Sequence, residues 1–313
     1  MNHATYLRAG VPVTALGLLF IALAVAPGAR GQSPVATSAP RNPPCASCAT
    51  WNAEQQPFRV FGNAYYVGTH GLGAILVTSD SGHVLIDAAL PESVPLIVAH
   101  IRALGFRIED VKLLLNSHDH FDHAGGMAEL QKLSGAPLAV SPPSAAVFRS
   151  GLSGQDDPQY GLVQPIARVR NIRVVADGET LHVGPIAVTA HFTAGHTPGG
   201  TTWSWRSCEA GRCADMVYAD SQTPVSADGF FFTRSRTYPS AIQDFEHGHA
   251  ALEAMPCDIL LTPHPDASGM WERLARRDAG EPLAFINPMA CKEYAATARK
   301  ALARRIAIET GTP

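Results

Sequence analysis

The feature that most constrains this chain is a dense group of ionisable side chains after an apolar run. In "LLLNSHDHFDHAGGM" (residues 113–127), three histidines and two aspartates occupy six consecutive positions. Such side chains repel one another or compete for protons unless a cation gathers them. In an extended segment His118 and His120 share one side, while Asp122 and His123 converge from the turn into a helix. Imidazole and carboxylate are common zinc ligands, so the stretch supplies four candidates.

Further ligands are expected where other strands end. His196 in "TAGHTPGGT" and His264 in "LLTPHPDAS" each follow a strand-like run beside glycine or proline, which lets the backbone bring an imidazole into a cleft. "EHGH" (246–249) has a similar spacing, but it lies in a helical region without a following carboxylate, so we assign it to no site. The other histidines are interpreted as surface or core residues: His3, His70, His83, His100, His182, His191, His247 and His249.

The first 31 residues have the order of a secretory signal peptide. Arg8 precedes the apolar run "VTALGLLFIALAVA", and small residues follow it. This run is shorter than the about 20 residues that span a bilayer, so a membrane anchor is the less favoured alternative. Residues 32–50, rich in Pro, Ser and Ala, are expected to form a flexible leader. We expect one folded domain over residues 51–313 and a periplasmic location.

Six cysteines in a secreted chain indicate an oxidising compartment, where disulfides persist. Cys208 and Cys213 flank the turn-like "EAGR" between two strand-like runs, so they could clip a hairpin. Cys257 and Cys291 would close a longer C-terminal loop. For the "CASC" motif (45–48), a local disulfide or a free pair is favoured over a zinc half-site or a redox pair, because no second CxxC lies nearby.

Strand-like and helix-like segments alternate along both halves. Apolar runs bounded by turn residues predict strands at 58–69, 73–80, 82–90, 111–117, 137–142, within 172–195, and at 201–207, 214–220 and 257–263. Helical spacing predicts helices at 93–106, 125–135, 239–255, 265–278 and 289–308. Strands followed by helices in both halves favour an α/β fold of two sheets packed face to face with helices outside. A single doubly wound sheet is the alternative, but no GxGxxG follows an early strand.

Four motifs in this order resemble those of the metallo-β-lactamase superfamily, and more narrowly of subclass B3: "SHDHFDHAGG", "AGHTPGG", "YADS" and "TPHPDASGMW". The similarity covers essentially the whole chain from about Trp51. It implies an αββα sandwich of two mixed β-sheets, with two zinc ions in the cleft between the sheets. Other subclasses place cysteine where this chain has Ser221, or asparagine at the first histidine, so these residues favour B3.

The resemblance implies a first zinc held by His118, His120 and His196, and a second zinc held by Asp122, His123 and His264. Asp87, at the end of "HVLID", would orient a ligand without binding the metal. Asp119 is a departure, because relatives often carry a small or neutral residue there. Its opposite parity predicts a side chain that points away from the metals. Its charge would give either tighter zinc retention or an altered substrate preference.

The expected chemistry follows from the charges. Two divalent ions about 3.5 to 4 Å apart create a hydroxide nucleophile from a shared water near neutral pH. We expect it to attack a β-lactam carbonyl polarised by the first zinc, while the second zinc and Asp122 stabilise the nitrogen anion. Neither SxxK nor GxSxG is present, which argues against a serine nucleophile. Ser221 and Thr223 are candidates for binding the substrate carboxylate, and Gln159 and Tyr160 for the rim of the cleft.

The predicted partner is a small-molecule β-lactam, whose hydrolysis would confer antibiotic resistance. The formal net charge is −3 and no basic stripe is present, so nucleic acid is not expected as a partner. We expect a monomer. One alternative is another hydrolase on this scaffold, a lactonase or a thioesterase resembling glyoxalase II, in which Asp220 would bridge both metals. A non-catalytic metal-binding protein is the third hypothesis.

Overall fold

The computed structural model describes residues 45–312, so the predicted signal peptide and most of the predicted leader lie outside the described residues. The described chain forms a seven-stranded and a five-stranded sheet. The first contains β1 (Phe58–Phe61), β2 (Ala64–Tyr66), β3 (Ile75–Val77), β4 (His83–Ile86), β5 (Val111–Leu115), β6 (Leu138–Val140) and β7 (Ile172–Val174). The second contains β8 (Thr180–Val183), β9 (Ile186–Phe192), β10 (Thr201–Glu209), β11 (Arg212–Tyr218) and β12 (Ile259–Leu261).

Both sheets are mixed. In the first, strands follow chain order, antiparallel from β1 to β4 and parallel from β4 to β7. In the second, the order is β12-β11-β10-β9-β8, and only β11 and β12 pair in parallel. These two mixed sheets confirm the predicted fold class and exclude a single doubly wound sheet for the described chain.

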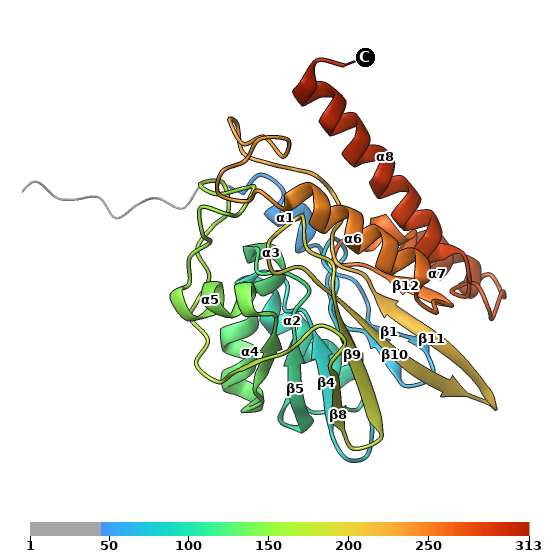
Figure 1. The fold of residues 1–313 in the computed structure, drawn as a ribbon. Coiled ribbons are helices and arrows are strands. Elements are labelled where there is room, and N and C mark those ends of the chain that lie inside the picture. The colour runs from blue at the N-terminus through green and yellow to red at the C-terminus, as the bar shows by residue number, and fades with distance from the viewer. Residues whose placement is uncertain (1–44, 313) are drawn as a thin grey trace, which may run out of the picture. The chain divides into compact units, whose positions relative to one another are not determined.

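Helices flank the sheets (Figure 1). The α-helices are α1 (Cys48–Trp51), α2 (Val94–Ala103), α3 (Phe121–Ala124), α4 (Met127–Ser134), α5 (Pro142–Ser150), α6 (Ala241–Ala254), α7 (Met270–Asp278) and α8 (Ala290–Thr310). Short 3-10 helices are η1 (Pro91–Ser93), η2 (Ile108–Asp110) and η3 (Pro265–Ser268).

Period-two alternation within the strands builds the layers. In β4, Val84 and Ile86 join a core cluster that also contains Val188 and Trp203 of the second sheet, so this core lies between the sheets. Leu85 points the other way, into a separate core on the outer face. The first sheet is therefore buried on both faces, as expected for strands that carry parallel partners.

Each outer face is covered by helices of its own half of the chain. Ile97 of α2, Leu130 of α4 and Phe148 of α5 pack into the outer core of the first sheet. Leu252 of α6 and Ala295 of α8 pack against the second sheet. This arrangement is the αββα sandwich that the resemblance implied.

Three local features differ from the sequence-based expectations. The predicted helix 265–278 is interrupted at Gly269, whose φ of 61° lies in the left-handed region and separates η3 from α7. Helix α5 was not predicted; two prolines at its first positions start it after Ser141. Helix α1 lies partly within the predicted leader, because Cys48 and Trp51 pack against the outer core of the first sheet.

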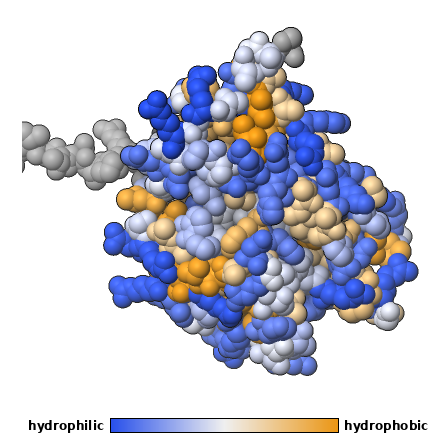
Figure 2. Space-filling model, in the orientation of Figure 1, coloured by the Kyte–Doolittle hydropathy of each residue, from blue (hydrophilic) through white to orange (hydrophobic). Residues whose placement is uncertain are grey.

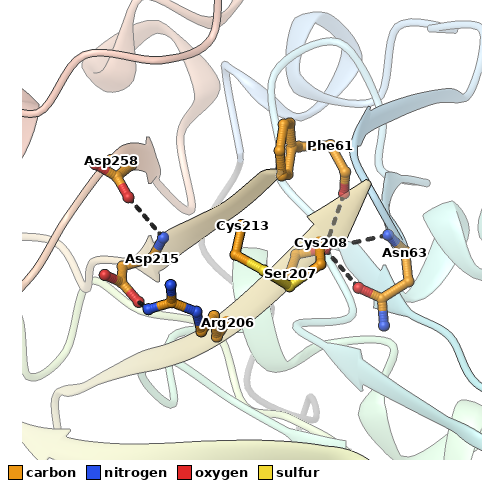
Figure 3. The surroundings of a disulfide bond; sticks show 8 residues. All are labelled: Phe61, Asn63, Arg206, Ser207, Cys208, Cys213, Asp215 and Asp258. Carbon is orange, nitrogen blue, oxygen red and sulfur yellow. Dashed lines mark hydrogen bonds and ion pairs between the residues drawn. A yellow bond between two sulfur atoms is a disulfide. The ribbon is translucent and has the colours of Figure 1, made fainter. Parts of the chain in front are cut away.

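A disulfide closes the end of the β10–β11 hairpin (Figure 3). Cys208 and Cys213 lie directly opposite each other in the strand register. The two-residue turn between the strands has φ values of 47° at Ala210 and 78° at Gly211, as tight hairpin turns require. Next to the disulfide, the Ser207 hydroxyl contacts the β1–β2 turn, so the hairpin is also attached to the other sheet.

The other four cysteines are also paired. Cys257 and Cys291 join the start of β12 to α8, so both predicted disulfides of the domain are confirmed. Cys45 and Cys48 form the local disulfide that was one of the two favoured alternatives. Within residues 45–312, no helix combines the length and apolarity needed to cross a bilayer.

The disulfides predict unequal effects on stability. Replacing Cys257 and Cys291 by alanine removes a cross-link between residues 34 positions apart. Replacing Cys208 and Cys213 removes a cross-link between residues only 5 positions apart. The entropy of the unfolded chain grows with loop length, so the expected losses in unfolding free energy are about 4 and about 2 kcal/mol. Urea unfolding of the two double variants measures this difference. Equal losses, or the reverse order, would show that native-state strain rather than chain entropy dominates.

Candidate metal centre

Six potential ligands meet where strands of both sheets end. Two histidines follow β5, an aspartate and a histidine lie on α3, and single histidines follow β9 and β12. They form two groups, His118 with His120 and His196, and Asp122 with His123 and His264, and within each group the ligand atoms lie within 4.8 Å of one another. The rings of His118 and His123 lie 4.5 Å apart, so the two groups are adjacent. These groups coincide with the two ligand sets predicted from the sequence.

The first group consists of three mutually inclined imidazoles. Ring centroids of His118, His120 and His196 are separated by 4.8 to 5.0 Å. The Nε2 atom of His118 is buried and has no hydrogen-bond partner among the described residues. Buried polar atoms are almost always paired, and a cation between the rings would supply this partner. The first group therefore fits a divalent metal ion.

The second group contains a carboxylate. One oxygen of Asp122 lies 3.2 Å from Nε2 of His123 and 3.4 Å from Nε2 of His264. Burial alone would raise the pKa of the Asp122 carboxyl, but these two histidines hold it well below its usual range. The outer nitrogen of His264 lies 3.3 Å from the carbonyl oxygen of Gly71, and its ring lies 5.4 Å from that of Trp51. An ionised carboxylate beside two imidazoles also fits a divalent cation.

Hydrogen bonds fix the orientation of the first-group rings. Nδ1 of His118 lies 2.8 Å from a carboxylate oxygen of Asp220, and Nδ1 of His196 lies 2.8 Å from the carbonyl oxygen of Thr223. A ring nitrogen that donates to such an acceptor leaves the other nitrogen unprotonated for a metal. Sequence analysis considered Asp220 only as a metal bridge; it follows a strand end, the same signal that identified the ligands.

The sequence did not predict a second carboxylate, Asp157, that contacts a first-group histidine. Nε2 of His120 lies 3.0 Å from Asp157, which belongs to the loop between α5 and β7. Burial disfavours the charged imidazole, but the hydrogen bond and the charge of Asp157 outweigh it and raise the pKa of His120. By contrast, burial lowers the pKa of His118 well below its usual value and that of His196 to about 3.

Asp87 acts on the backbone before the ligands rather than on a ligand side chain. Its buried carboxylate accepts hydrogen bonds from the Ser117 N–H at 2.7 Å, from the Asn116 amide at 2.9 Å and from the Tyr218 hydroxyl at 2.8 Å. The hydroxyl of Ser117 donates to the second oxygen at 2.7 Å. The carboxylate thus holds the residue that immediately precedes His118, and its orienting role stays a prediction.

Asp119 turns away from the two groups, as its parity predicts. Its carboxylate accepts a hydrogen bond of 2.5 Å from the hydroxyl of Ser144 on α5. Burial raises the pKa of this carboxyl to about 6. The side chain therefore attaches the ligand loop to α5.

Of the candidate substrate-binding residues, Thr223 and Gln159 contact histidines of the first group. Ser221 is buried beside Asp220, and Thr223 is exposed. The side-chain amide nitrogen of Gln159 lies 3.5 Å from a ring nitrogen of each of two first-group histidines. Tyr160 is about half exposed, at 51%. Gln159 was predicted to lie at the rim of the cleft, but its amide lies closer to the predicted metal position than that.

Comparison with known proteins identifies the family. The family model described as the metallo-beta-lactamase superfamily matches residues 73–286, more than half of the chain. The chain belongs to the metallo-β-lactamase superfamily.

Solved structures refine the assignment within this superfamily. The chain is 54% identical to Rm3 metallo-β-lactamase, over 86% of this chain and 100% of that chain, with a TM-score of 0.84. It is 50% identical to MEM-A1, a subclass B3 metallo-β-lactamase isolated from a soil metagenome library, over 84% and 100% of the chains, with a TM-score of 0.82. A curated relative, the uncharacterized protein YobT of Bacillus subtilis (strain 168), is 29% identical over 133 residues; the match spans 41% of this chain and 54% of YobT. The resemblance to subclass B3 is confirmed.

The "EHGH" segment of this metallo-β-lactamase family member contributes to neither ligand group. It lies on α6, where His249 is fully buried and both ring nitrogens lack a hydrogen-bond partner among the described residues. Burial, assisted by Arg299, lowers the pKa of His249 to about 4. The imidazole is therefore neutral in the folded protein at pH 7.

Protonation of His249 predicts an acid-induced loss of stability. The unfolded chain takes up this proton near pH 6.5 and the folded chain only near pH 4, so stability is full above about pH 6.5 and falls as the pH decreases toward 4. His249→Leu removes this uptake. We expect the unfolding free energy of the wild type to fall by about 1 to 3 kcal/mol more than that of the variant between pH 7 and 4.5. Urea unfolding of both proteins at each pH measures this difference. The contributions of the candidate ligand histidines are the same in both proteins and therefore cancel. Parallel pH profiles of the two unfolding free energies would contradict the prediction.

Proposed function

We propose that this protein hydrolyses the amide bond of β-lactam antibiotics with two zinc ions, one in each ligand group, and thereby confers resistance. The observation that carries the proposal is the pair of adjacent three-ligand groups, linked by the 4.5 Å contact between His118 and His123. Three protein ligands per zinc leave a position open for water or substrate. The relative that is 54% identical is named a metallo-β-lactamase, which supports this substrate class.

The protein's own residues prepare this chemistry. When bound, a pair of zinc ions would lower the pKa of water toward neutrality and polarise a carbonyl oxygen. Asp220 and the carbonyl of Thr223 orient the imidazoles of His118 and His196 before any metal arrives, so little reorganisation is required. Asp122 remains ionised because its neighbours lower its pKa, and its negative charge would help to neutralise the second ion.

Short polar side chains on the loop after β11 are suited to the substrate carboxylate. Ser221 and Thr223 follow the strand that leads to Asp220, and the Thr223 hydroxyl lies 3.3 Å from Nδ1 of His196. In this proposal, these hydroxyls donate hydrogen bonds to the substrate carboxylate, and the side-chain amide of Gln159 contacts the polar part of the β-lactam. Tyr160, exposed on the same loop as Gln159, is suited to apolar substituents.

The position of Asp220 favours a β-lactamase over the alternative hydrolases. A glyoxalase II-like thioesterase or a lactonase would use this aspartate to bridge both metals. Here one oxygen of Asp220 contacts the outer nitrogen of His118, on the side away from the metal position, and Asp220 belongs to neither ligand group. A non-catalytic role is less favoured because both ligand groups are complete.

The same proposal covers processing, location and assembly. Residues 1–31 would be cleaved as a signal peptide, 32–50 would form the leader, and 51–313 the catalytic domain in the periplasm. Three disulfides support an oxidising compartment. On the face drawn in Figure 2, apolar residues form separate areas surrounded by polar ones, which is consistent with a monomer.

A substrate panel tests the reaction class. The purified protein with zinc is expected to hydrolyse a chromogenic cephalosporin and a carbapenem, and a chelator should abolish turnover because both ligand groups would lose their ions. Initial rates on these β-lactams, a thioester and a lactone, with and without chelator, measure this. Turnover of the thioester or lactone alone would support the alternative hydrolases. Two bound zinc ions without turnover of any substrate would support the non-catalytic hypothesis.

Two neighbouring aspartates provide a matched pair of variants. Asp122→Ala removes a proposed metal ligand, so kcat/KM should fall by about 100-fold or more, the upper end of losses caused by residues that only support ligands. Asp119→Ala removes a carboxylate that contacts Ser144 instead, and kcat/KM should fall by less than about 10-fold. Steady-state kinetics and zinc content of both variants measure the contrast. The reverse order would show that the second metal has been assigned to the wrong residue.

A further inference from the structure

The loop between α5 and β7 contacts the first ligand group through Asp157 and Gln159. One backbone hydrogen bond closes most of the loop: the Ile166 N–H donates to the carbonyl of Gly151 at 3.0 Å. Further along, the Ala227 N–H, on the loop after β11, donates to the carbonyl of Pro158 at 2.8 Å. The segment around Pro158 is therefore held both by its own loop and by the loop after β11.

Asp157 is the point at which this loop meets a metal-ligand side chain. Asp157 is 2% exposed, and its carboxylate accepts hydrogen bonds from two different partners. One oxygen lies 3.0 Å from Nε2 of His120, and the other accepts the backbone N–H of Gln159 at 2.7 Å. One buried side chain thus serves a proposed ligand and the backbone of the residue whose amide lies near the first metal position.

The contact requires a carboxylate. Both partners of Asp157 are donors, and among the described residues its one ion-pair partner is His120. An asparagine offers one oxygen and would direct an amide N–H at the second donor. The oxygen that accepts from Gln159 also lies 3.3 Å from Nε2 of His120, so asparagine could keep that longer contact, but its amide N–H would face Nε2 where the second carboxylate oxygen now lies 3.0 Å away. The short contact to His120 therefore depends on the carboxylate, and a buried polar group left without its partner costs about 1 to 3 kcal/mol.

We propose that Asp157 is a positioning residue that couples the first metal site to the substrate-contacting loop. By accepting from Nε2 of His120, it holds the imidazole in the tautomer that leaves Nδ1 free for the metal. By accepting from the N–H of Gln159, it fixes the start of the turn that holds the Gln159 amide 3.5 Å from Nδ1 of His120. Metal retention and substrate contact then depend on the same carboxylate.

The metal half is tested without any substrate. In an Asp122→Ala background the second group lacks its carboxylate, so zinc affinity reports the first group. Adding Asp157→Ala should weaken zinc binding by about 10- to 100-fold in competition with a chromophoric chelator. Asp156→Asn is the matched control, because it removes the neighbouring exposed charge, which contacts neither ligand group. Equal zinc affinity with and without Asp157 would overturn the proposal, as would an equal loss in the control.

The substrate half rests on the proposed function and uses a double-mutant cycle. Gln159→Ala should raise KM for a β-lactam in the otherwise unchanged protein. In Asp157→Ala the amide is already released, so adding Gln159→Ala should change KM by less than about 2-fold. The same increase in both backgrounds would overturn the coupling.

Two controls keep these outcomes separable. Circular dichroism establishes that each variant is folded, and Asp157→Asn replaces Asp157→Ala in both experiments if the alanine variant does not fold. If the wild type cleaves no β-lactam, the proposed function fails while the zinc competition still decides whether Asp157 supports the first metal site.

Discussion

The candidate metal centre depends on hydrogen bonds that fasten one sheet to the backbone emerging from the other. The indole N–H of Trp203 in β10 donates to the carbonyl of Asn116 at 3.0 Å, and the N–H of Thr201 donates to the carbonyl of Ser117 at 2.7 Å. All four residues are buried, where such bonds are strong and an unpaired group is costly. Because His118 follows directly, the first ligand is placed by the second sheet as much as by its own strand.

This attachment explains why the ligands can come from both sheets. His118 leaves β5, whereas His196 leaves β9, and their rings nevertheless lie 4.8 Å apart. Gly200, in the "AGHTPGG" motif, permits the approach, since a Cβ atom there would lie 2.3 Å from a carboxylate oxygen of Asp220. A side chain at this position would displace the carboxylate that orients His118. The contact between Asp220 and His118 therefore requires glycine at this position of the motif.

The six candidate ligands could be proposed from the sequence because their signal is local. A polar side chain directly after an apolar strand is visible within ten residues, and the strands themselves follow from apolar runs bounded by turn residues. Of the supporting carboxylates, Asp220 carries this signal but Asp157, in a loop after a helix, does not. Neither partner could be read from the sequence, since Asp157 is 37 residues from His120 and Asp220 is 102 residues from His118. Their pairing depends on how the loops close over the sandwich.

The errors in the secondary-structure prediction have the same origin. The break at Gly269 needs a left-handed residue, but glycine is also tolerated inside helices, so apolar spacing alone joined η3 to α7. Helix α1 is too short to be stable by itself and exists because Trp51 packs against the domain. In both cases tertiary contacts decide what local propensity leaves open.

The two ligand groups are held by different physical means. In the first, buried imidazoles are aligned by hydrogen bonds of 2.8 to 3.0 Å to Asp220, Asp157 and the carbonyl of Thr223. In the second, the side chain of His264 is 36% exposed, and its outer nitrogen has a longer contact of 3.3 Å. The charged candidate ligand, Asp122, would compensate for this weaker alignment, because Coulomb attraction to a cation depends less on direction than an imidazole lone pair does. The first group therefore relies on preorganisation by the fold, and the second relies on charge.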